Sequence, residues 1–269
     1  MKECSNTILT ILIPLNRIDN YLEESINSLI GQKFSDYKCI VLMPKKLENN
    51  IEDLKKIFFN DPRFEFIFLN LDGIAFALNY GLNLVKSKYV ARMDADDIAH
   101  PNRLLSQIKF LENNSDYGVV GGMIDIIDEN SKILSKSFKY YKDNDDIRAA
   151  LKYRMPLCHP ALMFRTELLF LQKGYLYGNT AEDHELFIRI ARNKNIKFYN
   201  LPEKVLEYRK HPLQSTDMRH AKNAHANISG FLFTEFLRTG NLLYILGILA
   251  NTPISRRFRT FISQINRSK

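Results

Sequence analysis

Segments with the pattern of buried strands alternate with helical segments over the first third of the chain, and this alternation constrains the fold most strongly. Apolar, often β-branched runs recur at residues 7–14, 37–43, 64–69 and 88–94. Between them, segments that place apolar side chains on one helical face lie at 19–31, 51–59 and 73–86. Strands that alternate with helices fold into a doubly wound, mostly parallel sheet. We therefore expect an α/β fold of this kind.

The rest of the chain is expected to extend this sheet and then to become helical. The pattern predicts further strands near 117–127, 132–140, 157–165, 197–200 and 204–210. It predicts further helices from Pro101 onward, near 145–153 and near 181–195, and only helices after about 217. We expect one domain over residues 1–216, with halves at about 1–125 and 126–216, and a helical C-terminal extension at 217–269.

Composition excludes several classes of protein. The chain has 269 residues, 45% hydrophobic and 25% charged, which is ordinary for a globular protein. Its three cysteines, Cys4, Cys39 and Cys158, are scattered, which argues against a disulfide framework or a zinc site and for reducing cytosol. Pro14 interrupts the apolar run near the N-terminus, so we interpret that run as a core strand rather than a signal peptide. No run approaches the ~20 apolar residues of a membrane span.

The net charge of +8 suits an anionic partner such as a nucleotide, a nucleic acid or an acidic lipid. A basic surface without a specific ligand is an equally simple interpretation. No recognition-helix or RNA-binding motif accompanies the charge, so we expect no nucleic acid among the partners.

Three carboxylates stand within four residues directly after the fourth expected strand: Asp94, Asp96 and Asp97, in YVARMDADDIAHPNRL. Like charges this close repel one another unless a cation offsets them. Ligands of open α/β sheets bind at the carboxyl ends of the strands. Carboxylate oxygens suit Mg²⁺ or Mn²⁺, which keep open positions for substrate phosphates. The cluster therefore suggests a divalent metal site.

Other acidic motifs fit the cluster less well. A calcium-binding EF-hand loop requires glycine at its sixth position and glutamate at its twelfth, and neither is present. A phosphatase that phosphorylates the first aspartate of a D-x-D motif expects a uniformly apolar strand before it, which Arg92 interrupts. An ordinary carboxylate pair at a turn stays open, because D-x-D alone is a weak signal.

Six stretches, in their order and spacing, resemble family 2 glycosyltransferases of the GT-A fold. They are ILIPLNRIDNYLEESINSLIGQKFSDYKCIVL, GIAFALNYGLNLVKSKYVARMDADDIAHPNRLLSQIKFLENN, VVGG, HPALMFR, AEDHELFIRIA and YRKHPLQS, and they cover about residues 7 to 216. The second and fifth stretches are together highly specific. The resemblance implies a GT-A catalytic domain that transfers a sugar from a nucleoside-diphosphate-sugar donor.

The resemblance also implies a divalent ion, Mn²⁺ or Mg²⁺, that binds the donor diphosphate. It assigns Asp94 and Asp96 to the D-x-D motif, with Asp96 as the direct metal ligand and Asp97 as a residue that orients the loop. His211 aligns with a position that binds metal or diphosphate in such enzymes. A surface-loop histidine is an equally good interpretation of His211.

A base must take the proton of the acceptor hydroxyl. By resemblance Asp183 is this base, Glu182 is its partner in a catalytic pair, and the transfer of a hexosyl or N-acetylhexosaminyl group inverts the anomeric centre. The alternative is that both are ordinary first-turn carboxylates that complement the helix dipole. The residues expected to contact the donor are Pro14, Asn16, Asp94 and Arg103.

The sequence departs from the family pattern after the second strand. The family usually carries an acidic turn there whose first aspartate reads the nucleotide base. Here Leu42, Met43 and Pro44 occupy that register, in VLMPKKLENN, without a carboxylate. A uridine diphosphate sugar is still the donor that the resemblance implies first, but its base must be read differently. The departure also leaves open a non-catalytic protein that keeps the fold and binds a nucleotide or glycan.

The resemblance implies a glycan or lipid-linked acceptor, and a cytoplasmic enzyme of bacterial surface polysaccharide assembly that works at the inner face of the cell membrane. The tail ISRRFRTFISQINRSK carries five basic residues and no acidic one. Its apolar residues recur at helical spacing from Ile254 to Ile265. We expect this tail to lie as an amphipathic helix on an anionic membrane. The alternative is that its apolar face packs on the catalytic domain.

Overall fold

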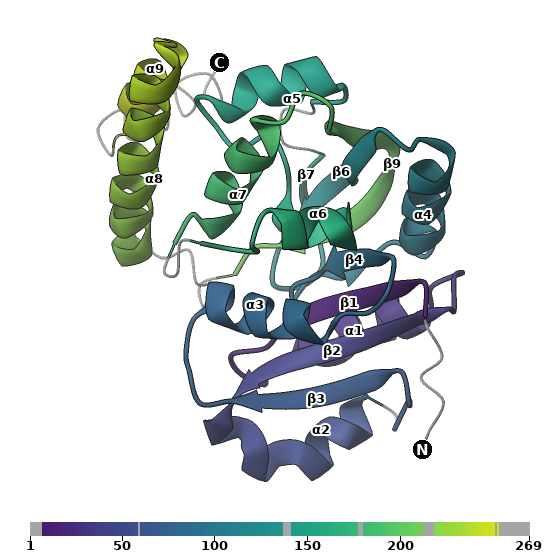
Figure 1. Cartoon of the computed structure of the whole chain (residues 1–269). Helices are drawn as coiled ribbons and strands as arrows, with labels where there is room; N and C mark the ends of the chain where they lie inside the picture. Colours follow the sequence, from purple (N-terminus) through teal and green to yellow (C-terminus); the bar gives the residue numbers. More distant parts are fainter. Residues whose placement is uncertain are drawn as a thin grey trace, which may run out of the picture.

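The computed structural model of the chain describes residues 7–58, 60–136, 141–176, 180–211, 218–250 and 252. Four parallel strands form the part of the sheet that the alternating pattern predicted. In spatial order they are β3 (Phe64–Leu69), β2 (Tyr37–Pro44), β1 (Leu9–Pro14) and β4 (Tyr89–Arg92) (Figure 1). Because β1 pairs with β2 on one side and β4 on the other, the winding reverses at β1. The loops after β1 and β4 therefore lie side by side at the carboxyl end of the sheet.

Beyond β4 the sheet continues with strands of mixed direction. The short strand β8 (Met163–Arg165) pairs antiparallel with both β4 and β6 (Tyr117–Ile127). Strand β9 (Lys197–Arg209) runs parallel to β6. Two further short strands, β5 (Ile98–Ala99) and β7 (Ile133–Lys136), pair antiparallel with β9 and β6. The mixed α/β architecture expected from the sequence is thus confirmed.

Strand β9 corrects one expectation about this region. The sequence pattern predicted two short strands near 197–200 and 204–210, but the structure forms a single strand over both. Strand β9 keeps its pairing with β6 through shifts of register around Met123. At Leu201 and Pro202 the alternation of apolar and polar residues is lost, and the sequence pattern therefore predicts that the strand ends there. The irregular pairing accommodates this stretch within one strand.

Helices connect the strands and cover both faces of the sheet. In chain order they are α1 (Leu22–Ile30), α2 (Ile51–Ile57), α3 (Ile74–Leu84), α4 (Arg103–Asn113), α5 (Asn144–Leu151), α6 (Thr166–Leu171) and α7 (Glu182–Ala191), with 3-10 turns η1 (Lys45–Asn50) and η2 (His159–Ala161). The short elements β5, η1, η2 and α6 were not predicted from the sequence. Each is too short to show a periodic pattern of its own.

Side chains of β1 alternate between two hydrophobic layers. Leu9, Ile11 and Ile13 pack with α1 and α4 on one face, whereas Leu12 packs with α3 on the other. All four are at most 2% exposed. This two-sided burial explains why β1 reads as a continuous apolar run rather than an alternating one. The rigid double layer fixes the positions from which the loops at the carboxyl end emerge.

The C-terminal extension is helical as expected, with α8 (Met218–Thr239) and α9 (Leu243–Ala250) standing beside α7 (Figure 1). Leu232 is fully buried in the main hydrophobic cluster, and Glu235 beside it forms an ion pair with Arg192 at 2.5 Å. Among the described residues, no helix has the length and apolar character needed to cross a membrane. The expected domain boundary at 216/217 and the expected tail helix at 254–265 lie outside the described residues.

Replacing Leu232 with alanine tests whether α8 is an integral part of the domain. The change leaves a cavity in the shared core, so we expect the free energy of unfolding to fall by roughly 2–5 kcal/mol in a single transition. The matched control is Leu237→Ala on the same helix, where the side chain is 67% exposed. We expect the control to change stability by about 0.5 kcal/mol or less. Equal effects of the two changes in urea unfolding would show that α8 does not pack as described.

Candidate functional site

The acidic cluster lies in the loop that follows β4, as the sequence predicted. One carboxylate oxygen from each of Asp94, Asp96 and Asp97 lies within 4.8 Å of the others. Since β4 is the parallel neighbour of β1, this loop lies next to the segment after Pro14. The arrangement places three carboxylates at the point where the winding of the sheet reverses.

Asp94 is held by a buried arginine from the preceding strand. Arg92 Nη1 donates to Asp94 Oδ2 at 2.7 Å, and Arg92 Nη2 lies 2.5 Å from Asp94 Oδ1. The Arg92 side chain is 6% exposed, so this two-pronged ion pair is formed largely away from water. Arg92 therefore fixes the orientation of the first aspartate in the D-x-D motif.

Asp96 meets His211 across the site. His211 Nε2 lies 2.9 Å from Asp96 Oδ2, although the two residues are 115 positions apart in the sequence. The His211 ring packs against the Tyr21 ring with centroids 4.8 Å apart, and Arg17 Nη2 lies 3.5 Å from His211 Nε2. The structure therefore brings together all three residues predicted to bind metal, Asp94, Asp96 and His211, and places the loop after β1 beside them.

Asp97 faces inward rather than toward an open site. It is fully buried, and its Oδ1 accepts the backbone N–H of Arg209 at 2.9 Å. Its other oxygen, Oδ2, has no hydrogen-bond partner among the described residues. Asp97 thereby ties the loop after β4 to the end of β9.

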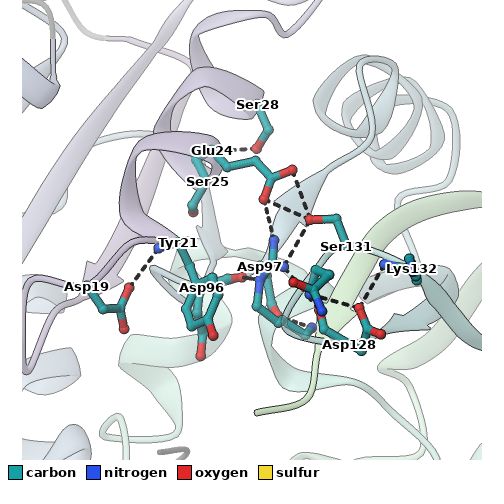
Figure 2. A network of polar contacts seen from close by, with 12 residues as sticks. Asp19, Tyr21, Glu24, Ser25, Ser28, Asp96, Asp97, Asp128, Ser131 and Lys132 are labelled. Carbon is teal, nitrogen blue, oxygen red and sulfur yellow. Dashed lines mark hydrogen bonds and ion pairs between the residues drawn. The ribbon is translucent and has the colours of Figure 1, made fainter.

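Arg209 connects the acidic loop to two other parts of the chain. Its Nε donates to the backbone oxygen of Asp96 at 2.8 Å, and its Nη2 bonds Glu24 of α1 at 2.5 Å. Its Nη1 donates to the backbone oxygen of Asp128 and to Ser131 Oγ in the turn between β6 and β7. Figure 2 shows Glu24, Asp128 and Ser131 converging near Asp96 and Asp97. Because Arg209 is fully buried, this network holds the loop after β4 from the protein interior.

The electrostatics of the cluster favour a bound cation. Burial raises the pKa of Asp97 well above its usual value, and the charges of Asp94 and Asp96 raise it further. Burial also raises the pKa of Asp94, an effect that Arg92 partly offsets. The ionised forms of these carboxyl groups are therefore costly here, and a bound cation would stabilise them. Carboxylates with a neighbouring imidazole are suitable ligands for Mn²⁺ or Mg²⁺, so these residues fit a divalent ion.

Glu182 and Asp183 begin α7 and differ in their surroundings. Ala181 precedes them in the left-handed conformation, with φ of 63°. Glu182 is 8% exposed, and burial, followed by the Asp183 charge, raises its pKa to about 7. Asp183 is half-buried, and its Oδ1 accepts the backbone N–H of His184 at 2.7 Å. Asp183 is close enough to the cluster for its charge to raise the pKa of Asp94.

The remaining predicted residues occupy different positions. Pro14 ends β1 half-buried, and Asn16 is exposed in the following loop. Arg103 is 1% exposed, and its Nη2 donates to the backbone oxygens of Arg92 and Pro160 at 2.7 and 2.8 Å. Arg103 therefore holds the end of β4 against η2 from inside the core.

The sequence did not reveal several residues that build the site. Arg92 interrupts an apolar strand, and a buried charge beside a carboxylate cluster is a usable signal of an ion pair. Arg209 and Tyr21 carry no such signal, because their neighbours come from distant parts of the chain. Glu24 reads as an ordinary acidic residue in the first turn of a helix. Only the folded structure shows that these residues meet.

The chain is similar in sequence to known glycosyltransferases. Residues 10–169 match the family model described as glycosyl transferase family 2. The chain is 30% identical over 251 residues to the O-antigen biosynthesis glycosyltransferase WbnJ of Escherichia coli, covering 90% of this chain and 94% of WbnJ.

Solved structures confirm the type of fold. TarS 1-349 of S. aureus, in complex with UDP-GlcNAc, superposes with a TM-score of 0.67 at 17% identity, covering 85% of this chain and 66% of TarS 1-349. The mannosyltransferase PcManGT of Pyrobaculum calidifontis, in complex with GDP-Man and Mn²⁺, gives a TM-score of 0.62 at 16% identity, covering 90% of this chain and 69% of PcManGT. The expected GT-A fold is therefore confirmed.

Replacing Glu182 with glutamine tests the cost of burying this carboxyl group. Its pKa of about 7 lies above the ordinary 4.5, so its contribution to stability is present below pH 4.5 and lost as the pH rises through 7. We expect Glu182→Gln to raise the free energy of unfolding by roughly 1–3 kcal/mol near pH 8, because the neutral amide avoids the cost of a buried charge. Near pH 4 the variant and the wild type should be similar.

Urea unfolding at several pH values measures this difference. The control is Glu129→Gln, since Glu129 is exposed in the turn between β6 and β7. We expect the control to follow the wild type at every pH. A Glu182→Gln variant that is no more stable than wild type near pH 8 would contradict the described environment of Glu182.

Proposed function

Because this chain belongs to glycosyl transferase family 2, we propose that it transfers a sugar from a nucleoside-diphosphate-sugar donor to a glycan or lipid-linked acceptor, with inversion at the anomeric carbon. The observation that carries the proposal is the meeting of Asp96 and His211 beside Asp94, with Asp183 at the start of α7 close by. This arrangement combines a site for a metal-bound diphosphate with a carboxylate placed to act as a base.

We propose that Asp96 and His211 hold the metal ion, with Asp94 turned toward the same site by Arg92. Both Asp94 oxygens already contact Arg92, which supports Asp96 as the more direct ligand. When bound, Mn²⁺ or Mg²⁺ would act as a Lewis acid that neutralises the departing diphosphate. PcManGT was solved with Mn²⁺, which supports this assignment.

The donor that we propose is a uridine diphosphate sugar, with its nucleoside near Pro14 and Asn16. These residues stand at the carboxyl end of β1, next to the acidic loop. Met43 and Pro44 at the end of β2 offer no carboxylate to the base, and Met43 is buried. Backbone groups of the loop after β1 would then read the base. TarS was solved with UDP-GlcNAc, which supports a uridine nucleotide.

Asp183 is the base in this proposal, and Glu182 supports it. Glu182 is buried and its pKa of about 7 leaves it partly protonated at neutral pH. Asp183 is half-buried and reachable, and a hydrogen bond from the His184 N–H orients its carboxylate. Asp183 would take the proton of the acceptor hydroxyl while the oxygen of that hydroxyl forms a bond to the anomeric carbon. The bond to the diphosphate breaks on the opposite side, so the configuration inverts.

We propose that the product belongs to a bacterial surface polysaccharide, assembled at the inner face of the cell membrane. WbnJ, which matches over almost its whole length, is an O-antigen biosynthesis enzyme.

A non-catalytic protein that binds a nucleotide or glycan is the second candidate. The missing carboxylate at Met43 and Pro44 favours it, whereas the contact of Asp96 with His211 beside Asp94, with Asp183 near enough for its charge to act on Asp94, disfavours it. Donor hydrolysis measured with and without a chelator separates the two. Hydrolysis that requires the metal supports the enzyme, and its complete absence across nucleotide sugars supports the binding protein.

Asp96→Ala tests the metal site. Loss of this carboxylate should abolish Mn²⁺-dependent nucleotide binding while the fold survives, because Asp96 is half-buried at the surface of the site. Calorimetry with UDP measures the affinity in Mn²⁺ and in EDTA. The control is Asp116→Ala, which removes an exposed carboxylate paired with Lys197 at the other end of β6. If wild-type protein binds UDP equally well in Mn²⁺ and in EDTA, the metal assignment is wrong.

Asp183→Asn tests the base. The change is nearly isosteric, so it removes charge rather than packing, and transfer should fall by about 10²–10⁴ while donor binding persists. The matched control is Asp146→Asn, an exposed first-turn aspartate of α5. The control should keep wild-type transfer, because Asp146 serves only its own helix. A variant at position 183 with near wild-type turnover would move the role to Glu182 or elsewhere.

A further inference from the structure

Nearly all of the net positive charge of the chain lies in residues 218–269. Residues 218–269 contain eight lysines and arginines but a single acidic residue, Glu235, which gives a net charge of +7. The whole chain has a net charge of +8, so residues 1–217 are almost neutral. The basic character noted in the sequence is therefore a property of one region rather than of the whole surface.

The described part of this extension packs on the domain through one side of its helices. On α8, Leu232 is fully buried, and on α9, Tyr244 is 8% exposed. Gly247 on α9 lies so close to the backbone of Lys152 and Tyr153 that a side chain there would clash. One face of α9 is thus pressed against the segment after α5.

The opposite side of α9 presents leucines to solvent. Leu242 directly precedes α9, and its backbone oxygen accepts the N–H of Leu246 at 3.0 Å, so Leu242, Leu246 and Leu249 lie on one side; they are 68%, 54% and 59% exposed. We call these three residues the leucine face. Leu237, one turn before Gly240 at the end of α8, is 67% exposed. Neighbouring exposed apolar side chains of this kind are typical of a surface that contacts another protein or a membrane.

The only acidic side chain of residues 218–269, that of Glu235, does not reach this surface. Glu235 is fully buried, and its side chain pairs with Arg192 at 2.5 Å and with Arg238 at 2.7 Å. Residues 218–269 therefore combine basic and apolar side chains in their sequence with a single acidic side chain, which is buried and paired and so does not repel an anionic surface. Arginines at 256, 257, 259 and 267 continue this charge after α9 in the sequence.

We propose that the leucine face docks on the surface of an anionic lipid bilayer. Exposed leucines insert among the acyl chains near the headgroups, while arginines and lysines of the extension attract the anionic headgroups. Each basic residue near such a surface contributes about 1 kcal/mol, so a few of the basic residues in 218–269 suffice for reversible attachment. Docking does not depend on catalysis, but it would bring the enzyme to a lipid-linked acceptor, if the proposed function holds.

Sedimentation of the full chain with vesicles tests the proposal. The vesicles contain phosphatidylcholine with an increasing fraction of phosphatidylglycerol. We expect partition into the vesicles to rise with the anionic fraction and to weaken with salt. The variant Leu242→Ser/Leu246→Ser/Leu249→Ser should lower the partition coefficient by about tenfold or more, because it removes three inserted side chains.

The matched control replaces three leucines of similar exposure elsewhere: Leu134→Ser/Leu171→Ser/Leu176→Ser, at 58%, 71% and 55%. This control should partition like wild type. Asp183→Asn should also partition like wild type, so failure of the catalytic proposal and failure of the docking proposal are distinguishable.

Three results would overturn the proposal. The first is equal partition of the leucine-face variant and the wild type. The second is equal loss in the control triple, which would indicate non-specific adhesion. The third is a wild-type dimer in solution that the leucine-face variant converts to monomer without a change in vesicle binding. In that case the face belongs to a second copy of the chain.

Discussion

Buried arginines hold the acidic loop after β4, and the rest of the site depends on this interaction. Arg92 pairs with Asp94 through both oxygens, and Arg209 binds the backbone of Asp96 while its own N–H binds Asp97. A buried guanidinium is costly unless its donors are satisfied. Arg209 meets this condition with Glu24 and with the turn between β6 and β7. The same contacts place His211, two residues further along, against Asp96.

The sequence predicted the parts of the fold that depend on residues close together in the chain. Strand β3 occupies the expected residues 64–69, because its apolar run is bounded by Asp61 and Pro62 on one side and by Asp72 and Gly73 on the other. Strand β9 was predicted as two separate strands, because the irregular stretch in its middle has no periodic signal in the sequence. In the structure, its pairing with β6 continues across that stretch. Likewise Asp94 and Asp96 were found from their spacing, whereas the Glu24–Arg209 pair joins residues 185 positions apart. Such a contact exists only through the topology of the sheet.

Two adjacent carboxylates at the start of α7 acquire different properties from their surroundings. Glu182 turns into the protein, where burial raises its pKa to about 7, and Asp183 stays half-buried beside the acidic loop. Adjacent carboxyl groups in different environments can take different roles in an active site. The left-handed Ala181 sets this orientation by turning the chain just before the helix. In our account, the site therefore combines a metal-binding half from β4 and β9 with a base from α7.

The most direct test of this account is a crystal structure with UDP and Mn²⁺, with the metal located by its anomalous scattering. The account predicts an anomalous peak between Asp96 and His211, within coordination distance of Asp96 and of the diphosphate oxygens. It also predicts that Arg92 still holds Asp94 and that Arg209 still holds the loop. A diphosphate bound at the carboxyl end of the sheet without metal, and with the Asp96–His211 contact unchanged, would contradict the account.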